Sequence, residues 1–477
     1  MISIVDDSKL SYTNDDDFFS PSIKYPEYRL GHLSKRENRV YDAVRSVFSQ
    51  AGLDRERFGA VDWNPLAQFI KKSSRVFILC NLVYHRRLNE DKKDFSGKCT
   101  HGSVLRAVVD YILLAVGPNG QIRFGNAPLQ SCNWKLVLRD TGVDRVIQFY
   151  KERGVPVEAC DLRLLVTERG MTGLTGCIEH RDEQGCVAVD LEADSLVSDI
   201  QGVNTRFRVT DYNPHRTEAC HQKGRHVYFI NTRILESDIV FSIPKLKTHE
   251  KVGMTCAIKG CVGSVGHKDS LTHHRFGSPN HGGDEYPSDM LHIRSAMSHM
   301  HDAIQKLPLE SKTGRWLRSF DRILRSTVRP LFPCSGGAWW GNDTCWRMAM
   351  DLARILAYAD QTGKMQEIPV RPHLTLIDGV VGGEGPGPLA PAAVGSGVLI
   401  FGDNIVTTDW AAAILMGYDP QALPIVREAT RLNCYKLLAR PLSEETIINN
   451  SIQVTFEELK QKVKHHYRPP YGWKDRL

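Results

Sequence analysis

The stretch from Ile243 to Asp289 concentrates side chains that can do chemistry. It holds five of the chain's 18 histidines within 33 residues, together with five lysines and five carboxylates. Lysines offer positive charge to carboxylates or phosphates, and imidazoles move protons near neutral pH or bind a divalent metal. Glycines from Gly253 to Gly266 allow backbone N–H groups to approach a ligand. This pattern predicts a site for a small anion, and the alternative is a solvated loop with incidental histidines.

We assign roles within this stretch by the chemistry of each side chain. Lys245, Lys247 and Lys259 can hold negative charge, while the histidines can act as acid, base or metal ligand. Proton transfer at a carbon next to a carboxylate and metal-assisted hydrolysis both suit these groups, and the sequence leaves both reactions open. The candidate catalytic residues are His249, Lys259, His267 and His274.

A divalent metal is the cofactor that these side chains could hold, and any other cofactor stays unknown. The HxxH and HExxH spacings of helical zinc sites are absent, and the adjacent pair His273–His274 cannot present both rings on one helical face. A metal site would therefore combine histidine with nearby carboxylates. The candidate ligands are His273, His274, Asp284 and Glu285.

Polar residues at the carboxyl ends of predicted strands are expected to meet this stretch. RVFILC (75–80) predicts a buried strand, residues 104–116 a helix, and QIRFG (121–125) a second strand. This order predicts a right-handed parallel crossover, and α/β sheets bind ligands at the carboxyl ends of their strands. The candidate substrate-binding residues are Asn81, Asn126, Lys245, Lys247, Asp378 and Glu384.

The lysines carry two further expectations. We expect Lys245 and Lys247 to be exposed, so that replacing either by alanine leaves folding intact but weakens anion binding. Lys259 lies among small and glycine residues, where a long cationic side chain has little to pack on. It is therefore expected to point into a cavity or towards a bound group.

Further strands and helices are predicted along the chain. DIVFSI (238–243) predicts a central strand that ends at Pro244, because proline has no N–H to donate to a ladder. GGEGPGP (382–388) predicts a loop. Asp409 is expected to cap the start of its own predicted helix, 408–417. The other predicted elements are a helix over 37–51 and the strands HLTLIDG (373–379) and GVLIFG (397–402).

These elements place the chain in the α/β class, with a mixed, mostly parallel sheet in two lobes, a β-rich elaboration and a C-terminal α/β unit. Short apolar runs between 155 and 230 indicate that the added strands are partly antiparallel. The predicted segments are an N-terminal extension (1–70), a first lobe with the elaboration (71–235), a second lobe (236–440) with a basic surface insertion (307–345), and a tail (441–477).

Composition narrows the class of protein. The chain has 477 residues and a net charge of +6, which is too mild to indicate nucleic acid as a partner. No export signal and no apolar run long enough to span a membrane is visible, so no membrane partner is expected. The 12 cysteines form no CxxC pair, which is typical of reduced thiols in the cytoplasm. The oligomeric state stays open.

Several strings together resemble the domain of unknown function 362 family over roughly residues 75–429. They are FILCNLVYHRR, LRAVVDYILLAVGPNGQIRFGNAPLQSC, SIPKLKTHEKVGMTCAIKGCVGSVGHKDSLTHHR, GGDEYP, WWGNDTCWRM and LIDGVVGGEGPGP. The resemblance implies a cytosolic α/β domain, fused to ferredoxin-like modules in some members, and implies no particular activity. The chain departs from the family pattern at Leu79–Cys80, at Asn126 and at Gly260, so a carboxylate role at position 126 is in doubt.

A second similarity, confined to a few residues, is to lactate racemase. There a histidine lies ten residues before the lysine that tethers a nickel-pincer nucleotide, and His249, Gly253 and Lys259 reproduce that spacing. His274 falls near the position of a further nickel-binding histidine. Three hypotheses follow: an enzyme acting on a small anionic metabolite, a racemase-like isomerase with a tethered cofactor, and a non-catalytic binding or scaffold module that uses the basic residues 315–329.

Overall fold

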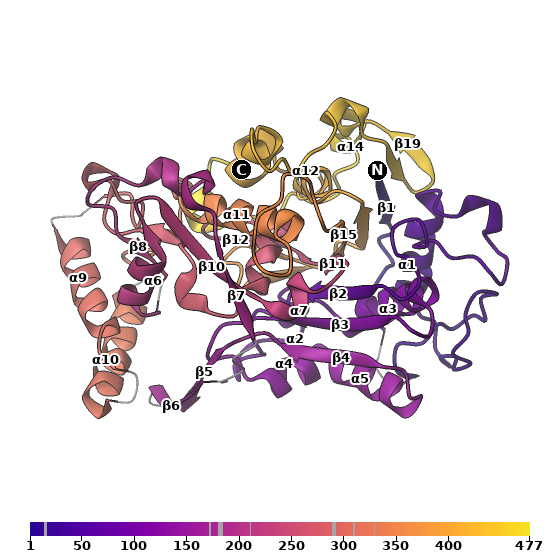
Figure 1. Cartoon of the computed structure of the whole chain (residues 1–477), viewed down its shortest axis with the longest axis horizontal. Coiled ribbons are helices and arrows are strands. Elements are labelled where there is room, and N and C mark those ends of the chain that lie inside the picture. Colours follow the sequence, from indigo (N-terminus) through magenta and orange to yellow (C-terminus); the bar gives the residue numbers. More distant parts are fainter. Residues whose placement is uncertain are drawn as a thin grey trace.

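The computed structural model describes residues 1–13, 17–170, 173–179, 185–209, 211–288, 292–308, 311–328 and 330–477. The main element of this part of the chain is a twelve-stranded sheet with the order β19-β18-β1-β17-β15-β11-β2-β3-β4, flanked by β12, β13 and β16 (Figure 1). The strands are β1 (Ile2–Asp6), β2 (Arg75–Cys80), β3 (Gln121–Asn126), β4 (Val157–Asp161), β11 (Ile239–Ile243), β12 (Lys245–His249), β13 (Gly253–Met254), β15 (His373–Glu384), β16 (Ala392–Val394), β17 (Val398–Gly402), β18 (Ile447–Asn449) and β19 (Ile452–Val454).

The sheet is mixed and mostly parallel, as the sequence predicted. The run β15-β11-β2-β3-β4 is parallel throughout. The strand β17 is antiparallel to both β15 and β1. Because the parallel strands share a direction, their carboxyl ends lie at one edge of the sheet, where α/β folds bind ligands.

Side chains of the central strands alternate between two hydrophobic cores. In β2, Val76 and Ile78 pack with α1, α3 and α5, while Phe77 and Leu79 pack with α8, α11 and α12. Such alternation is the period of two that places successive side chains on opposite faces of a sheet. The fold is therefore an α/β/α sandwich. These helices are α1 (Arg39–Gln50), α3 (Gly102–Val116), α5 (Val143–Glu152), α8 (Cys256–Gly260), α11 (Cys345–Tyr358) and α12 (Ile405–Leu415).

Local signals begin and end these helices close to the predicted residues. The α1 helix begins after Asn38, whose side chain accepts a hydrogen bond from the N–H of Tyr41. In α3 the end is set by Gly117, whose φ of 68° an L side chain rarely adopts. Asn404 caps α12 by accepting from two backbone N–H groups. The predicted helices 37–51 and 104–116 are confirmed as α1 and α3.

The predicted strand end before Pro244 is confirmed by β11 (Ile239–Ile243), whereas the first three residues of the predicted loop 382–388 belong to a strand. After Pro244 the chain continues extended as β12, which pairs with β15, because a proline interrupts a ladder at one residue without turning the chain. The glycines before Glu384 do not form a turn, since β15 runs to Glu384 and pairs there with β16. A Cβ at Gly383 would collide with backbone and side-chain atoms around it, so glycine allows close packing at this point.

The stretch between β4 and β11 supplies the strands of three small antiparallel sheets, except for β14, which follows β11; this confirms the predicted antiparallel elaboration. The hairpin β5–β6, the sheet β7-β10-β9 and the pair β8–β14 are all antiparallel. Their bounds are β5 (Leu165–Gly170), β6 (Gly173–Glu179), β7 (Cys186–Asp190), β8 (Phe207–Arg208), β9 (His221–Gln222), β10 (Arg225–Asn231) and β14 (His274–Arg275).

Strands from all four predicted segments share the one sheet. The N-terminal segment supplies β1, which lies between β17 and the tail strand β18. Two helices, α9 (Ile293–Gln305) and α10 (Lys312–Val328), lie together at the opposite end of the molecule from β1 (Figure 1). The remaining helices are α2 (Lys92–Ser96), α4 (Trp134–Asp140), α6 (Pro214–Cys220), α7 (Thr232–Leu235), α13 (Pro424–Arg427) and α14 (Phe456–Lys460).

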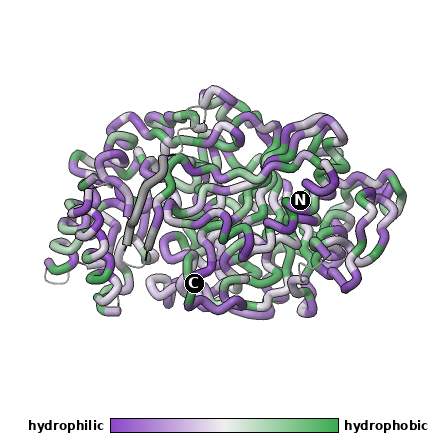
Figure 2. Tube along the Cα trace, turned by 90° about the horizontal axis from the view of Figure 1, so that it is seen from below, coloured by the Kyte–Doolittle hydropathy of each residue, from purple (hydrophilic) through white to green (hydrophobic). Residues whose placement is uncertain are grey.

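Apolar stretches of the chain run through the middle of the molecule (Figure 2). Within the described residues, no helix combines the length and the apolar character that crossing a membrane requires.

Candidate functional site

A cavity of about 770 Å³ opens at the carboxyl edge of the parallel strands. Its wall on the sheet side is made by Asn81 after β2, by Asn126 at the end of β3, and by residues of β12 and α8. The wall across from it includes residues of α9 and α10. This volume lies in the range of clefts that bury most of a small organic ligand.

Asn126 is brought to the cavity by close packing against a glycine. Its amide donates to the carbonyl of Cys80 at 2.6 Å, and Gly263 carries no Cβ, which would collide with that amide. The carbonyl of Gly263 in turn accepts a hydrogen bond from the N–H of Ala127 at 2.7 Å. The missing side chain of Gly263 therefore allows two chain segments to pack closely. The sequence had instead indicated that the glycines here let backbone N–H groups bind an anion.

The cavity lining is strongly cationic. Nine lysine and arginine side chains line it, against four carboxylates. Two of the four carboxylates form ion pairs with arginines of the lining. Asp302 lies 2.5 Å from Arg208, and Asp211 lies 2.7 Å from Arg325. The remaining lining therefore presents an excess of positive charge to whatever occupies the cavity.

Two of the lining lysines are buried and held by neutral oxygen atoms. Lys247 donates to the side-chain oxygen of Asn81 at 3.0 Å and to the carbonyl of Lys98 at 2.5 Å. Lys268 donates to the carbonyl of Val262 at 3.0 Å. Burial lowers the pKa of each of these ammonium groups to about 7, since no carboxylate is bonded to either.

Lys259 lies in the middle of this group of bases. Its side chain is 6% exposed, and no described residue forms a hydrogen bond or ion pair with its Nζ atom. Burial lowers the pKa of Lys259 itself. After burial, the positive charge of Lys259 is the largest cause of the lowered pKa values of His249 and His273. Lys259 is thus a cation without a counter-ion, pointing into the cavity as the sequence predicted.

Three histidines of the cavity, His249, His273 and His274, are neutral. The pKa of His249 lies well below its usual value, because its side chain is buried and three lysines surround it. Its Nδ1 atom accepts a hydrogen bond from the N–H of Lys251 at 3.1 Å, which leaves the ring proton on Nε2. His273 and His274 have similarly lowered pKa values, and their buried Nδ1 atoms have no partner among the described residues.

The structure brings most of the candidate site residues to the cavity. The catalytic candidates that line it are His249, Lys259 and His274, and the substrate-binding candidates are Asn81, Asn126 and Lys247. His273 and Glu285 of the metal candidates also line it. The other candidates lie elsewhere: Lys245, His267, Asp284, Asp378 and Glu384. Asp289, the last residue of the His- and Lys-rich stretch, lies outside the described residues.

Lys245 and Asp378 form a buried ion pair away from the cavity. Their charged atoms are 3.2 Å apart and both side chains are fully buried. Tyr12 donates to the same carboxylate at 2.6 Å, and Lys245 donates to the hydroxyl of Tyr12. The expected exposure of Lys245 and Lys247 is wrong, because both side chains are inside the protein and hydrogen-bonded there.

Glu384 fastens the C-terminal segment to the sheet. Its carboxylate accepts from the ring of His465 at 3.0 Å and from the N–H of Arg468 at 2.9 Å. His267 also lies outside the cavity, 3.9 Å from Asp269 and 3.4 Å from Arg216. The sequence could not show the partners His465, Arg468 and Arg216, since these come from distant parts of the chain.

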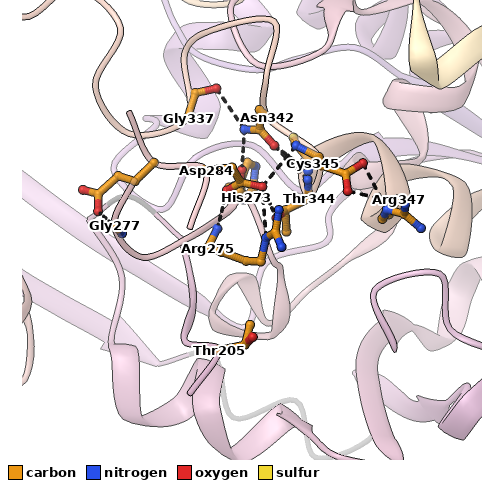
Figure 3. Close-up of polar contacts among 12 residues, drawn as sticks. Thr205, His273, Arg275, Gly277, Asp284, Gly337, Asn342, Thr344, Cys345 and Arg347 are labelled. Atoms are coloured by element: carbon orange, nitrogen blue, oxygen red, sulfur yellow. Dashed lines mark hydrogen bonds and ion pairs between the residues drawn. The ribbon is translucent and has the colours of Figure 1, made fainter. Parts of the chain in front are cut away.

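The four predicted metal ligands do not form a cluster. Asp284 accepts from the N–H of Arg275 at 2.6 Å and from the hydroxyl of Thr344 at 2.6 Å, which directs its oxygens at protein donors (Figure 3). Glu285 accepts from Ser298 at 2.6 Å and from the N–H of Gly277 at 3.1 Å. Across the part of the chain that the structure describes, no group of three or more His, Cys, Asp or Glu could hold a metal ion.

The sequence reasoning missed the second wall of the cavity. Residues 307–345 were expected to form a surface insertion, yet Arg322, Arg325 and Phe332 of this segment line the cavity. Arg294 and Met297 of α9 also line it, and no role was predicted for them. The run of basic residues along α10 was the available signal; Arg329 at its end lies outside the described residues.

The fold and the cavity define an α/β protein with a buried cationic pocket. The family model described as domain of unknown function (DUF362) matches residues 187–414, which supports the resemblance to that family. The strings before residue 187 that resemble the family lie outside the match. No curated protein matches the chain, so the similarity to lactate racemase is not shown. No solved structure matches it either.

Proposed function

We propose that this protein is an enzyme that acts on a small carboxylate or phosphate metabolite in the cationic cavity, by acid–base chemistry of Lys259 and His249. The observation that carries the proposal is Lys259, a buried lysine without a counter-ion among surrounding bases. A bound anion would supply the missing negative charge. Buried groups with shifted pKa values in a cavity are characteristic of functional sites.

The cavity lysines and His249 have different roles in the proposed reaction. Lys247 and Lys268 hold the acidic group of the metabolite, because both lie in the lining beside Lys259. Lys259, with its lowered pKa, has an amine form that can take a proton from the carbon next to that group. His249 donates the hydrogen on Nε2 to the substrate oxygen on which negative charge develops.

The free thiols of the described cysteines support a reducing, cytoplasmic setting for this reaction. Lysine and histidine side chains of the cavity lining can supply the acid and the base of this reaction directly. A non-catalytic module would share the cationic cavity but would move no proton.

Hydrogen exchange tests the proposed reaction. The protein is incubated in D₂O with 2-hydroxy, 2-oxo and 2-amino carboxylic acids and with phosphorylated acids, and loss of the α-proton signal is followed by NMR. We expect exchange with at least one compound. Lys259→Met removes the base, and His249→Asn removes the Nε2 donor while its side-chain oxygen replaces Nδ1 as an acceptor. Both variants should lose exchange.

Lys135→Met is the matched control, because Lys135 is exposed and does not line the cavity. It should exchange as the wild type does. Binding without exchange would identify a binding module and contradict the enzyme. Exchange that persists in Lys259→Met would remove Lys259 from the reaction.

A further inference from the structure

Arg294 is another buried cation of the cavity to which no described carboxylate is bonded. Its side chain is 7% exposed and lines the cavity. Its one hydrogen bond runs from Nη1 to the carbonyl of Ser288 at 3.4 Å, and its buried Nε has no partner among the described residues. A guanidinium has five N–H donors in a planar fork, so most of its donor capacity is unused here.

Aromatic rings hold this guanidinium in place. It lies over the ring of Phe332 at 5.1 Å and over that of Tyr286 at 5.8 Å. Burial lowers the pKa of Arg294, and the groups that oppose this shift are the Cys334 thiol and the Tyr286 phenol. Arginine stays protonated at neutral pH even so, which leaves a full positive charge in the wall of the cavity.

Lys259 and Arg294 come from different helices of the cavity lining. Lys259 lies on α8, which packs against α11 and α12 in the middle of the molecule. Arg294 lies on α9, which packs against α10 at one end of it (Figure 1). Arg322 of α10 lines the same wall as Arg294. A single cavity of about 770 Å³ joins these walls, which is room for more than one anionic group.

We propose that Arg294 forms a second anion-binding subsite, so that the substrate carries two anionic groups at separate ends, as a dicarboxylate or a phosphorylated carboxylic acid does. One end lies at Lys259, where the proton moves, and the other forms a forked pair with Arg294. This inference rests on the proposed function, because it places the first anionic group beside Lys259, where Lys247 and Lys268 hold it. A planar guanidinium suits carboxylate and phosphate because both accept two parallel N–H bonds.

Dicarboxylic acids of increasing chain length, each compared with a monocarboxylic acid, test the second subsite. Calorimetry compares each dicarboxylate with the monocarboxylate of the same chain length, from succinate against butyrate to sebacate against decanoate. The monocarboxylate controls for apolar contact. We expect a dicarboxylate of one length range to bind about tenfold or more tightly than its partner, because a charge-assisted hydrogen bond is gained at Arg294.

Substitutions then separate the two subsites. Arg294→Met should remove the gain from the second carboxylate and leave monocarboxylate affinity unchanged, while Arg294→Lys keeps part of the gain. Arg55→Met, at an exposed arginine outside the cavity, should change nothing. Thermal midpoints show whether each variant is folded. Should Arg294→Met unfold, the folded Arg294→Lys decides the test.

Three results would overturn the inference. Dicarboxylates that bind no more tightly than monocarboxylates at every length would remove the second subsite. An equal loss for both series in Arg294→Met would make Arg294 a packing residue. Failure of both series to bind, or indifference of both to Lys259→Met, would contradict the proposed function as well. A failure of the second subsite alone leaves Lys259-dependent monocarboxylate binding intact, so the two failures are distinct.

Discussion

Lys247 and Lys268 are cavity lysines held by neutral oxygen atoms, and this determines how they respond to pH. Lys247 and Lys268 have pKa values of about 7 in the folded protein, against about 10.4 for an exposed lysine. Between pH 7 and pH 10 the folded state therefore binds fewer protons than the unfolded state. Both lysines therefore increase the free energy of unfolding of the ligand-free protein as the pH rises through this window.

Anion binding should show the opposite trend. An anion favours the charged form of both lysines, so binding above pH 7 must take up protons. We expect the affinity for sulfate, whose charge is constant in this range, to fall from pH 7 to pH 9 by up to about tenfold per lysine per pH unit. Calorimetry at pH 8 in two buffers of different protonation enthalpy measures the uptake directly. An affinity that is flat across this range, with no proton uptake, would contradict the assignment.

Lys245 should act as a structural residue. Replacing it by alanine leaves the buried carboxylate of Asp378 without its cation, and loss of one partner of a buried pair costs about 3–5 kcal/mol. Urea unfolding of Lys245→Ala measures this loss. The double variant Lys245→Ala with Asp378→Ala is the control and should recover part of the stability. A single variant as stable as the wild type would show that the pair is unimportant.

Residue types in the sequence identified the lysines and histidines of the cavity. They could not show which of the two neighbouring lysines, Lys245 and Lys247, lines the cavity and which is buried elsewhere. Lys245 and Lys247 stand two apart on β12, and a strand places such residues on one face. Only Lys247 reaches the cavity, because Lys245 is bound by Asp378 and by Tyr12, which lies 233 residues earlier in the chain. No local pattern contains that information.

At the scale of elements, a carboxylate from another helix fixes the start of α8, the helix that carries Lys259. Asp409 was expected to cap its own helix, and this expectation is wrong. It lies inside α12 and accepts hydrogen bonds from the N–H groups of Ala257 and Ile258, at 2.7 and 2.9 Å. Burial raises the pKa of Asp409 to about 7 despite these bonds.

Asp409→Asn should therefore loosen α8. Above pH 7 the carboxylate accepts both N–H groups, whereas an amide has a single oxygen to accept with and points an NH₂ at the other N–H. The unmade bond should cost about 1–3 kcal/mol. Urea unfolding at pH 8 measures the stability, and sulfate titration measures the accompanying loss of anion affinity. Unchanged stability and affinity would show that Asp409 does not position the helix.

The sequence predicted the regular elements well and their irregular connections poorly. Apolar runs and caps located β2, β3, α1 and α3, since these signals are local. Pro244 ends β11 as predicted, but the sequence did not show that β12 begins directly after it and pairs with β15. The glycines before Glu384 were taken to form a loop, yet they allow a close approach between neighbouring segments, which depends on partners that the local sequence does not name.

At the scale of the whole molecule, the sheet joins segments that the sequence analysis separated. Residues 1–70 supply β1 to the interior of the sheet, and α1 packs against α3. Ile2, Ile4, Val44 and Phe48 from this segment are fully buried. Long-range strand pairing is invisible to local patterns, which is why this segment was expected to be an extension packed against the main body.

A chain of residues 71–477 should consequently fail to fold. It would leave β17 without its β1 partner and expose the apolar surface that α1 covers, at about 25 cal/mol for each Å² returned to water. Thermal unfolding followed by circular dichroism compares it with the full chain. We expect no cooperative transition in the shorter chain. A cooperative transition at the temperature of the full chain would show that residues 1–70 are dispensable.

The central claim is that the cavity binds an anion through Lys259, and calorimetric titration of sulfate at pH 7 tests it most directly. The wild type and Lys135→Met should bind sulfate, and Lys259→Met should bind it at least about tenfold more weakly, a difference of about 1.4 kcal/mol, with an unchanged thermal midpoint. Equal affinity of the wild type and Lys259→Met would contradict the account, as would absence of binding to the wild type.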